Sequence, residues 1–296
     1  MPIPLSSEES RRVLFETSAL PMWIHDQVGG RFLAANDAMI SSYGWSREEL
    51  LNLPLDAVVA SPSDRLTLSS VTPPLTLVDG GSHRRKDGRT LLVEVSVQEI
   101  DFEQRRGCLV LAIDVTERHL SEERIRHQAL HDHLTGLANR VLFNDRLEQA
   151  VAHAHRHNSR LAAISIDLDD FKSVNDNFGH SFGDILISEV AGRLKSALRQ
   201  TDTIARLGGD EFAVIVEGLV SASQAHEIAL KVRELLDENF EVEMRSVRVT
   251  ACIGISIYAR DGHDAGMLFR NSESALNRAK EVGHDNIQLF DESMSD

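Results

Sequence analysis

The sequence contains little cysteine and no long apolar run. Its only cysteines, Cys108 and Cys252, lie far apart without the spacing of metal ligands, which excludes a disulfide framework and favours a reducing compartment. No stretch reaches the ~18 apolar residues that span a bilayer. Residues 1–12 also lack a basic segment followed by an apolar one. We therefore expect no signal peptide, no membrane insertion and a cytoplasmic location.

Basic residues are also scarce relative to acidic ones. The chain has 31 Lys and Arg against 46 Asp and Glu, which gives a formal net charge of −15. An acidic surface repels DNA and RNA, whose binding requires clustered basic groups, so we expect no nucleic-acid partner. A nucleotide ligand would need metal ions to screen its phosphates.

Length and composition indicate two folded domains. The chain has 296 residues, of which 42% are hydrophobic, enough for packed cores rather than disorder. We predict a first domain over residues 8–117, a linker helix over 118–131 and a second domain over 132–290. The stretch 116–131 lacks glycine and proline and is rich in charge, which is typical of an exposed helix.

The second domain alternates strand and helix patterns, with a hairpin inserted. Gly208 and Gly209 separate two strand-like runs, and such a pair is a hairpin signal. Ser221 is placed to cap the start of one helix, and Gly283 to end another. This order predicts an α/β sandwich around a mixed sheet. The predicted strands are 161–168, 203–207, 211–218, 247–258 and 286–290, and the predicted helices are 184–199, 221–240 and 265–283.

Acidic residues follow one predicted strand and the glycine pair. Asp167, Asp169 and Asp170 lie at the end of the strand 161–168, and Asp210 lies in the hairpin. If the hairpin neighbours the strand, Asp167 and Asp210 converge, and carboxylates that close repel each other unless a cation lies between them. Such oxygen ligands suit Mg²⁺, which binds through one or two carboxylates and substrate phosphates. Taken alone, each feature is more often an ordinary turn or helix cap.

Four segments together carry a more specific signal. Residues 132–140 read DHLTGLANR, 167–184 read DLDDFKSVNDNFGHSFGD, 206–212 read RLGGDEF and 279–286 read AKEVGHDN. In this order and spacing they resemble the GGDEF family of diguanylate cyclases, over about residues 130–290. The resemblance implies a nucleotidyl-cyclase fold related to the ferredoxin-like βαββαβ plan. It also implies the condensation of two GTP molecules into cyclic di-GMP, with pyrophosphate leaving.

The resemblance assigns metal-binding and catalytic roles. Asp167 and Asp210 match the carboxylates that bind Mg²⁺ or Mn²⁺, with the Leu168 carbonyl as a further ligand. Glu211 matches a second acidic residue, which serves as a metal ligand or a proton acceptor, and Lys172 matches a catalytic residue beside the phosphates. The metal ions would polarise the α-phosphate and aid deprotonation of the attacking 3′-hydroxyl.

The resemblance also assigns substrate contacts. Asn175 and Asp184 match the pair that reads guanine, and a carboxylate can accept from guanine N1–H and the 2-amino group together. Adenine offers no such pair of donors, so we expect ATP to be rejected. The other matches to substrate-binding residues are Phe171, Arg206, Gly208, Gly209 and Lys280.

Two further features concern regulation and affinity. Arg199 and Asp202 form an RxxD motif that resembles the inhibitory site at which members of the family bind their product, although such a pair is also a common surface ion pair. His284 stands where active relatives often carry arginine, and neutral histidine contacts phosphate more weakly than guanidinium does. We expect product inhibition and a reduced affinity for the triphosphate.

The first domain resembles a PAS sensor domain. The resemblance rests on the segment FETSALPMWIHDQVGGRFLAANDAMISSYGWSREELL and on the exit DVTER that leads into the linker helix. It does not name a ligand for the PAS domain. We interpret His25 and His83 as surface or hydrogen-bonding residues, outside the stretch around 55–70 where haem-binding relatives carry their ligand. We expect Trp23 and Trp45 in the core or at its rim.

A cyclase of this kind requires two copies of the chain. Each GGDEF domain holds one GTP, so we expect a homodimer through the GGDEF domain, the PAS domain and the linker helix. Leu120, Ile125, Ala129 and Leu130 give that helix only a short apolar seam, below the roughly three to four heptads of an independent coiled coil. We hypothesise that the PAS domain shifts this helix and so regulates the cyclase.

Two other functions stay open. The end of the chain, NIQLFDESMSD, is similar to the junction that in many relatives leads into an EAL phosphodiesterase domain. The chain could then be a GTP-binding regulatory module of a GGDEF–EAL protein. The other alternative is a PAS dimerisation or sensing protein with a decayed output domain, which intact Asp167, Asp184, Asp210 and Lys280 argue against.

Overall fold

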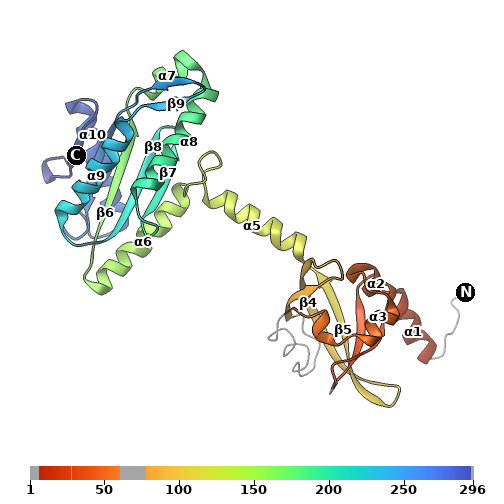
Figure 1. The fold of residues 1–296 in the computed structure, drawn as a ribbon. Coiled ribbons are helices and arrows are strands. Elements are labelled where there is room, and N and C mark those ends of the chain that lie inside the picture. The colour runs from red at the N-terminus through yellow and green to blue at the C-terminus, as the bar shows by residue number, and fades with distance from the viewer. Residues whose placement is uncertain (1–6, 28, 61–77, 295–296) are drawn as a thin grey trace, which may run out of the picture. The chain divides into compact units, whose positions relative to one another are not determined.

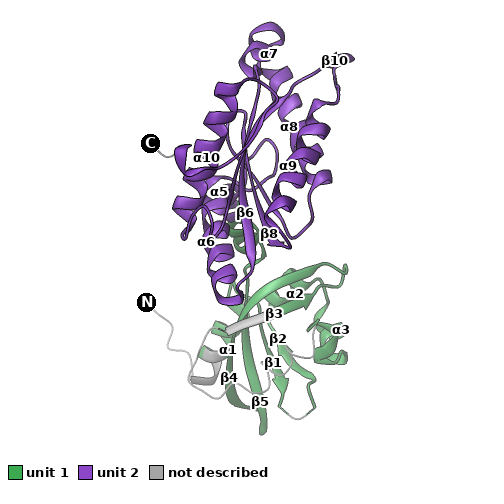
Figure 2. Cartoon of the chain, turned by 90° about the vertical axis from the view of Figure 1, so that its left-hand side faces the viewer, with its two compact units in different colours: residues 1–124 green, residues 125–296 purple. Residues whose placement is uncertain are grey.

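The chain folds into two compact units, each with its own hydrophobic core. The structure is a computed structural model that describes residues 7–27, 29–60 and 78–294 (Figure 1). The units comprise residues 1–124 and 125–296 and have different colours in Figure 2. The boundary between them falls inside the predicted linker helix.

The first unit is an antiparallel sheet with short helices. The strand order is β2-β1-β5-β4-β3, and all of these pairs are antiparallel. Much of the stretch around 55–70, which we considered for a haem ligand, lies outside the described residues. The elements are α1 (Ser7–Thr17), β1 (Met22–Asp26), β2 (Phe32–Ala35), α2 (Asp37–Tyr43), α3 (Arg47–Asn52), η1 (Leu55–Ala57), β3 (Val78–Arg84), β4 (Thr90–Phe102) and β5 (Arg105–Asp114).

Aromatic and histidine side chains fill the core of this unit. Trp23 is fully buried, and Trp45 packs against the core from its rim, as predicted. His83 is also buried, with its Nδ1 2.7 Å from the Tyr43 hydroxyl, so the hydrogen-bonding interpretation holds for His83 and the surface interpretation is wrong. The side chain of His25 is buried too, and burial lowers its pKa to about 4, which keeps the imidazole neutral near pH 7.

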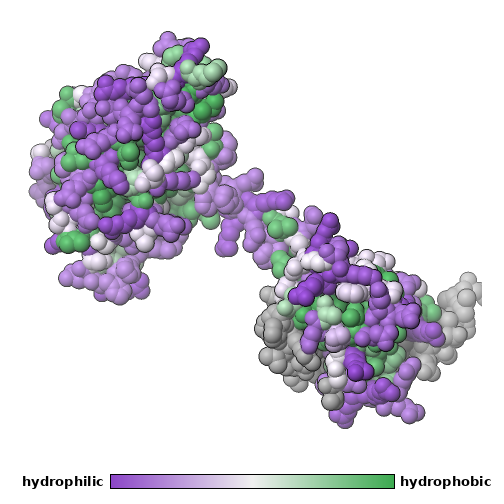
Figure 3. Space-filling model, in the orientation of Figure 1, coloured by the Kyte–Doolittle hydropathy of each residue, from purple (hydrophilic) through white to green (hydrophobic). Residues whose placement is uncertain are grey.

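The predicted linker helix is present as α5 (Thr116–Leu130), and none of its residues is buried. Leu120 and Ile125 are 42% and 64% exposed, so their apolar side chains are available for a partner. Hydrophilic residues predominate along the rest of this helix (Figure 3). None of the described helices combines the length and the apolarity that crossing a bilayer requires.

The second unit is a five-stranded mixed sheet with helices on both faces. The strand order is β12-β11-β6-β8-β7, in which β11 and β12 are parallel and the other pairs antiparallel. The succession β6-α8-β7-β8-α9-β11 with the order β11-β6-β8-β7 is the predicted ferredoxin-like βαββαβ plan. The elements are α6 (Arg140–His157), β6 (Arg160–Leu168), α7 (Phe171–Phe178), α8 (His180–Ala197), β7 (Thr203–Gly208), β8 (Glu211–Leu219), α9 (Ala222–Asp237), β9 (Phe240–Val242), β10 (Arg245–Val247), β11 (Ala251–Ile257), α10 (Ala265–Val282), β12 (Ile287–Leu289) and η2 (Glu292–Met294).

Side chains of successive strand residues point to opposite faces, so the sheet has two apolar cores. On β6, Ile164 and Ile166 pack with α8 and α9, whereas Leu161 and Ala163 pack with α6. Figure 2 shows α8 and α9 on one side of this sheet and α6 and α10 on the other. Asp167 therefore lies on the face that α10 covers.

One helix start, one strand start and one helix cap differ from those predicted. The helix expected at 184 begins at His180, because Gly179 with φ 87° ends α7 and starts α8 directly. The strand expected from 247 begins at Ala251. Ser221 occupies the N-cap position of α9, but its side chain makes no capping hydrogen bond, since the hydroxyl lies 2.8 Å from that of Ser223. Gly283 ends α10 as predicted.

Candidate active site

Asp167 lies near the end of the central strand β6, between two neighbouring strands. Its partners across the sheet are Glu211 on β8 and Cys252 on β11. The Asp167 side chain is only 14% exposed, and its Oδ2 lies 2.8 Å from the Lys280 Nζ of α10. Two residues earlier on the same face, the buried hydroxyl groups of Ser165 and Ser272 lie 2.8 Å apart and also join β6 to α10. The end of β6 and the last turns of α10 therefore form one wall of the site.

The glycine hairpin brings Asp210 to the same place. Gly208 and Gly209 have φ of 151° and 51°, which a residue with a Cβ rarely adopts, and a Cβ at either would meet nothing within 4 Å. The tip of the hairpin touches the end of β6, where the Leu168 N–H donates to the Asp210 carbonyl at 3.4 Å. Asp167 and Asp210 are therefore neighbours, as the sequence predicts.

The charge of the site is not balanced by its own residues. Burial raises the pKa of Asp167 above its usual range, and the negative charges of Asp210 and Asp169 raise it further. The ammonium group of Lys280 opposes this effect but does not cancel it. The ionised form of Asp167 thus lacks sufficient positive charge nearby, which is the condition that a bound cation relieves.

These residues fit a divalent cation that is shared with a substrate. Among the described residues, no three His, Cys, Asp or Glu side chains are gathered to hold a metal ion by themselves. Mg²⁺ commonly binds through one or two carboxylates and completes its coordination with phosphate oxygens and water. Asp167 and Asp210 would supply the two carboxylates, and the excess negative charge around Asp167 favours such an ion.

The two aspartates that follow β6 have different partners. Asp169 Oδ2 accepts hydrogen bonds from Thr250 Oγ1 at 2.6 Å and from the Asp285 N–H at 2.8 Å. Asp169 thereby ties the end of β6 to the loop after α10. Asp170 has a positive φ of 55°, and its Oδ2 lies 3.4 Å from His284 Nδ1. His284 is therefore at the rim of the site, close to an acidic residue.

Four of the residues predicted to contact guanine or phosphate lie on α7 and α8. Phe171 is buried at the start of α7, and Lys172 beside it is exposed. Asn175 follows one turn later and is half-buried, and Asp184 is exposed in the first turns of α8. The structure brings Asn175 and Asp184 to the same helix corner.

Arg206 braces the hairpin from within the protein. Its guanidinium donates to the Gly209 carbonyl at 3.0 and 2.8 Å and to the Asp132 carboxylate at 3.2 and 3.3 Å, and its side chain is 11% exposed. Burial acts to raise the pKa of Asp132, but hydrogen bonds from Thr135 and Arg206 outweigh it and lower the pKa. A contact between Arg206 and substrate stays a prediction. Glu211 is half-exposed and lies 3.4 Å from Arg140.

Arg199 and Asp202 form a compact turn at the end of α8. The Arg199 N–H donates to Asp202 Oδ2, and the Asp202 N–H donates to the Arg199 carbonyl, both at 3.0 Å. The contact thus uses the Arg199 backbone, and the simple ion pair that we considered as an alternative is not seen. Both residues line a cavity of about 380 Å³.

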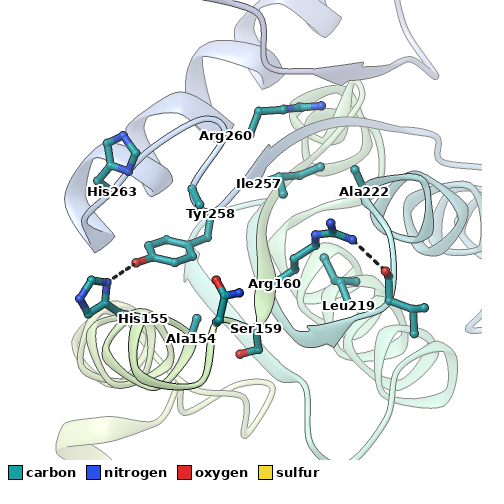
Figure 4. Close-up of a pocket in the computed structure, with 13 residues that line it drawn as sticks. Ala154, His155, Ser159, Arg160, Leu219, Ala222, Ile257, Tyr258, Arg260 and His263 are labelled. Carbon is teal, nitrogen blue, oxygen red and sulfur yellow. Dashed lines mark hydrogen bonds between the residues drawn. The ribbon is translucent and has the colours of Figure 1, made fainter.

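Another cavity, of about 920 Å³, lies at the opposite end of β6 (Figure 4). Arg160 lines it and donates to the Val220 carbonyl at 2.9 Å. Tyr258 also lines it, with its hydroxyl 3.4 Å from His155 Nδ1. None of the predicted site residues borders this cavity, so it is separate from the carboxylate site.

The sequence did not single out two residues that shape the site. Asp132 stood in the segment DHLTGLANR, but its partner Arg206 is 74 residues away, and no local pattern indicates such a pairing. Gly183 stood in the segment HSFGD, yet its contact with Asn175 depends on the angle between two helices.

Comparisons with known families agree with this geometry. The model of the GGDEF domain, described as diguanylate cyclase, matches residues 129–286, and that of the PAS fold matches residues 9–115. The chain is 40% identical over 68% of its length to the bifunctional diguanylate cyclase/cyclic di-GMP phosphodiesterase MucR of Pseudomonas aeruginosa, of which it covers 28%. It is 32% identical over 78% of its length to the diguanylate cyclase TpbB of the same species, of which it covers 55%. The chain thus spans about half or less of these relatives.

Solved structures lead to the same family. The GGDEF domain of TpbB from Pseudomonas aeruginosa superposes with a TM-score of 0.55 at 34% identity, covering 55% of this chain and 96% of that one. The coiled coil and GGDEF domain of DgcB from Caulobacter crescentus, in complex with c-di-GMP, gives a TM-score of 0.55 at 26% identity, covering 59% of this chain and 93% of that one. The predicted order of PAS followed by GGDEF is confirmed. The chain therefore belongs to the GGDEF family, with a PAS fold ahead of its GGDEF domain.

Proposed function

We propose that this chain is a diguanylate cyclase that condenses two GTP molecules into cyclic di-GMP and pyrophosphate. The observation that carries the proposal is that Asp167 and Asp210 lie together beside Lys280. They lie at a glycine hairpin with open space where the side chains of Gly208 and Gly209 would otherwise be. Relatives named as diguanylate cyclases support it. A triphosphate and a divalent cation together complement this arrangement of charges.

One group of residues is placed to contact the phosphates of GTP, and another is placed to contact its guanine base. Lys280 is the cation already beside Asp167, and it can neutralise phosphate oxygens when a nucleotide enters. Gly208 and Gly209 leave the backbone of the hairpin accessible, so that its amides can approach a phosphate. Asn175 and Asp184 hold the guanine ring by hydrogen bonds to its polar edge. Mg²⁺ or Mn²⁺ held by Asp167, Asp210 and the Leu168 carbonyl would polarise the α-phosphate and lower the pKa of the attacking hydroxyl.

Assembly and regulation follow from the same chemistry. One GGDEF domain offers one set of guanine and phosphate contacts, so two chains must face each other, and we propose a homodimer. The exposed Leu120 and Ile125 of α5 are candidate contacts for the second copy. The PAS domain would act through this helix. Arg199 and Asp202, beside their own cavity, would bind the product and inhibit the enzyme.

The direct test is incubation of the full chain with GTP and Mg²⁺, followed by chromatography for cyclic di-GMP and pyrophosphate. The proposal predicts both products in a ratio of one to two, since each of the two condensations releases one pyrophosphate. Asp167→Asn is the control, because it preserves shape but removes the charge that binds the cation. Absence of both products from a dimeric wild-type chain that binds GTP would contradict the proposal.

A second candidate is a GTP-binding regulatory module within a longer protein. It is favoured by relatives such as the cyclic di-GMP phosphodiesterase NbdA of Pseudomonas aeruginosa, which is 36% identical over 56% of this chain and of which the chain covers 21%. Such a module would bind GTP through the same residues without turning it over. Tight GTP binding in the absence of product selects this candidate.

A further inference from the structure

Gly183 lies at the corner where α7 meets α8, directly before Asp184. It is buried, and its N–H donates to the Gly179 carbonyl at 3.2 Å. A Cβ built on Gly183 would lie 2.0 Å from Asn175 Oδ1, 3.0 Å from Asn175 Cγ and 3.1 Å from Phe171 Cζ. The side-chain amide of Asn175 therefore occupies the space that any other residue at position 183 would fill.

The atoms that would meet this Cβ belong to side chains, not to backbone. The Asn175 amide can rotate about its side-chain torsions, so an alanine at position 183 would displace the amide and leave the two helices in place. Alanine also has a higher helix propensity than glycine, by about 1 kcal/mol, which favours α8. The missing Cβ is thus not required for the fold, but it is required for the observed position of Asn175.

In the wild-type structure the side-chain amide of Asn175 is free to bind a ligand. The structure shows no hydrogen bond of the Asn175 side chain to any residue that it describes, and the same holds for the Asp184 carboxylate. An amide offers both a donor and an acceptor, and the neighbouring carboxylate offers only acceptors. Together they complement the polar edge of guanine, which carries donors beside an acceptor.

We propose that Gly183 is a positioning residue that determines guanine recognition: its lack of a side chain holds the Asn175 amide beside Asp184. The inference rests on the proposed function, since it assumes that this corner reads the base of GTP. It predicts that the contact fails when a single methyl group is added, while the phosphate site on β6 and α10 is unaffected. Gly183 acts through Asn175 and touches no substrate atom itself.

The test measures binding of 3′-deoxy-GTP with Mg²⁺ by calorimetry, because this analogue lacks the attacking hydroxyl and cannot be condensed. Gly183→Ala should weaken binding about tenfold, as expected when one hydrogen bond to a buried base is lost. Gly192→Ala is the matched control on the same helix, because a Cβ there meets nothing within 4 Å, and it should bind as the wild type does.

A double-mutant cycle separates positioning from general damage. Asn175→Ala should weaken binding by a similar factor, and adding Gly183→Ala to it should change the affinity less than twofold. Equal effects of Gly183→Ala with and without Asn175 would overturn the inference, as would wild-type affinity in the single variant. If the wild-type chain does not bind 3′-deoxy-GTP, both the proposed function and the inference are wrong. If the wild-type chain binds the analogue and Gly183→Ala binds it equally well, the inference is wrong and the proposed function is unaffected.

Discussion

Gly254 controls how closely α10 approaches the sheet, and its substitution tests whether that approach sets the activity. Gly254 lies in β11, against which α10 packs. A Cβ at this position would lie 2.2 Å from both the Leu276 N and the Ser272 O. Both are backbone atoms and cannot rotate away. In Gly254→Ala, α10 must therefore retreat by at least about 1.2 Å to restore the 3.4 Å of ordinary contact.

The expected losses of stability and of kcat follow from the packing of α10 and from the position of Lys280 on it. Overpacking of this kind costs about 1–3 kcal/mol of folding free energy, and each kcal/mol lowers the Tm of a domain of this size by about 3 °C. The same movement takes the Lys280 Nζ away from Asp167 Oδ2, which it now approaches to 2.8 Å. A displacement of about 1 Å at a reacting centre can cost about 100-fold in rate. We expect a kcat for cyclic di-GMP synthesis lowered by about this factor.

The assay combines thermal unfolding with the initial rate of pyrophosphate release at saturating GTP. Gly192→Ala again serves as the control and should match the wild type in rate. An unchanged Tm in Gly254→Ala would refute the claim that α10 is held against the strand at this residue. A lowered Tm with wild-type kcat would refute the claim that the position of α10 matters for catalysis.

Three other predictions concern single side chains. Asp167→Asn should lower product formation at least about 100-fold, since it removes a cation-binding charge, and should raise the Tm at pH 7. The Tm rises because the pKa of Asp167 is higher in the folded than in the unfolded state, so its ionised form destabilises the fold. Stability is therefore lost as the pH increases through the folded pKa. A lower Tm in the variant would contradict this direction. Arg206→Gln should destabilise the protein by about 2 kcal/mol in denaturant unfolding, because the Gly209 carbonyl and Asp132 lose their donors, and a wild-type stability would count against the brace. Arg199→Ala should raise the concentration of cyclic di-GMP that halves the rate by about tenfold, and unchanged inhibition would exclude Arg199 from the product site.

The sequence was sufficient for the five strands of the second sheet, for α8, α9 and α10, and for the central pair of carboxylates. The elements α6, α7, β9 and β10 were not among those predicted. Strands 161–168 and 211–218 have continuous apolar patterns and appear as β6 and β8 within one residue or so of the predicted ends. Their antiparallel pairing brings the glycine hairpin to the end of β6, and this follows from alternation and short connections. The meeting of Asp167 and Asp210 could therefore be predicted.

Other features depend on distances that no pattern encodes. The ion pair between Asp167 and Lys280 requires the crossing of α10 over β6, which the absence of a side chain at Gly254 permits. The burial of His25 and His83 was missed because histidine is usually exposed or half-exposed, and only the packing of the PAS core decides its environment. The start of α8 at His180 was missed because a positive φ at Gly179 joins two helices without a loop.

The central claim is that Asp167 and Asp210 bind one divalent cation together with the triphosphate. Electron paramagnetic resonance of Mn²⁺, titrated in the presence of 3′-deoxy-GTP, measures this directly. The account predicts that the wild-type chain retains Mn²⁺ tightly, and that Asp167→Asn and Asp210→Asn each lose most of this binding while keeping their folded circular dichroism spectrum. Wild-type Mn²⁺ affinity in either variant would contradict a shared cation.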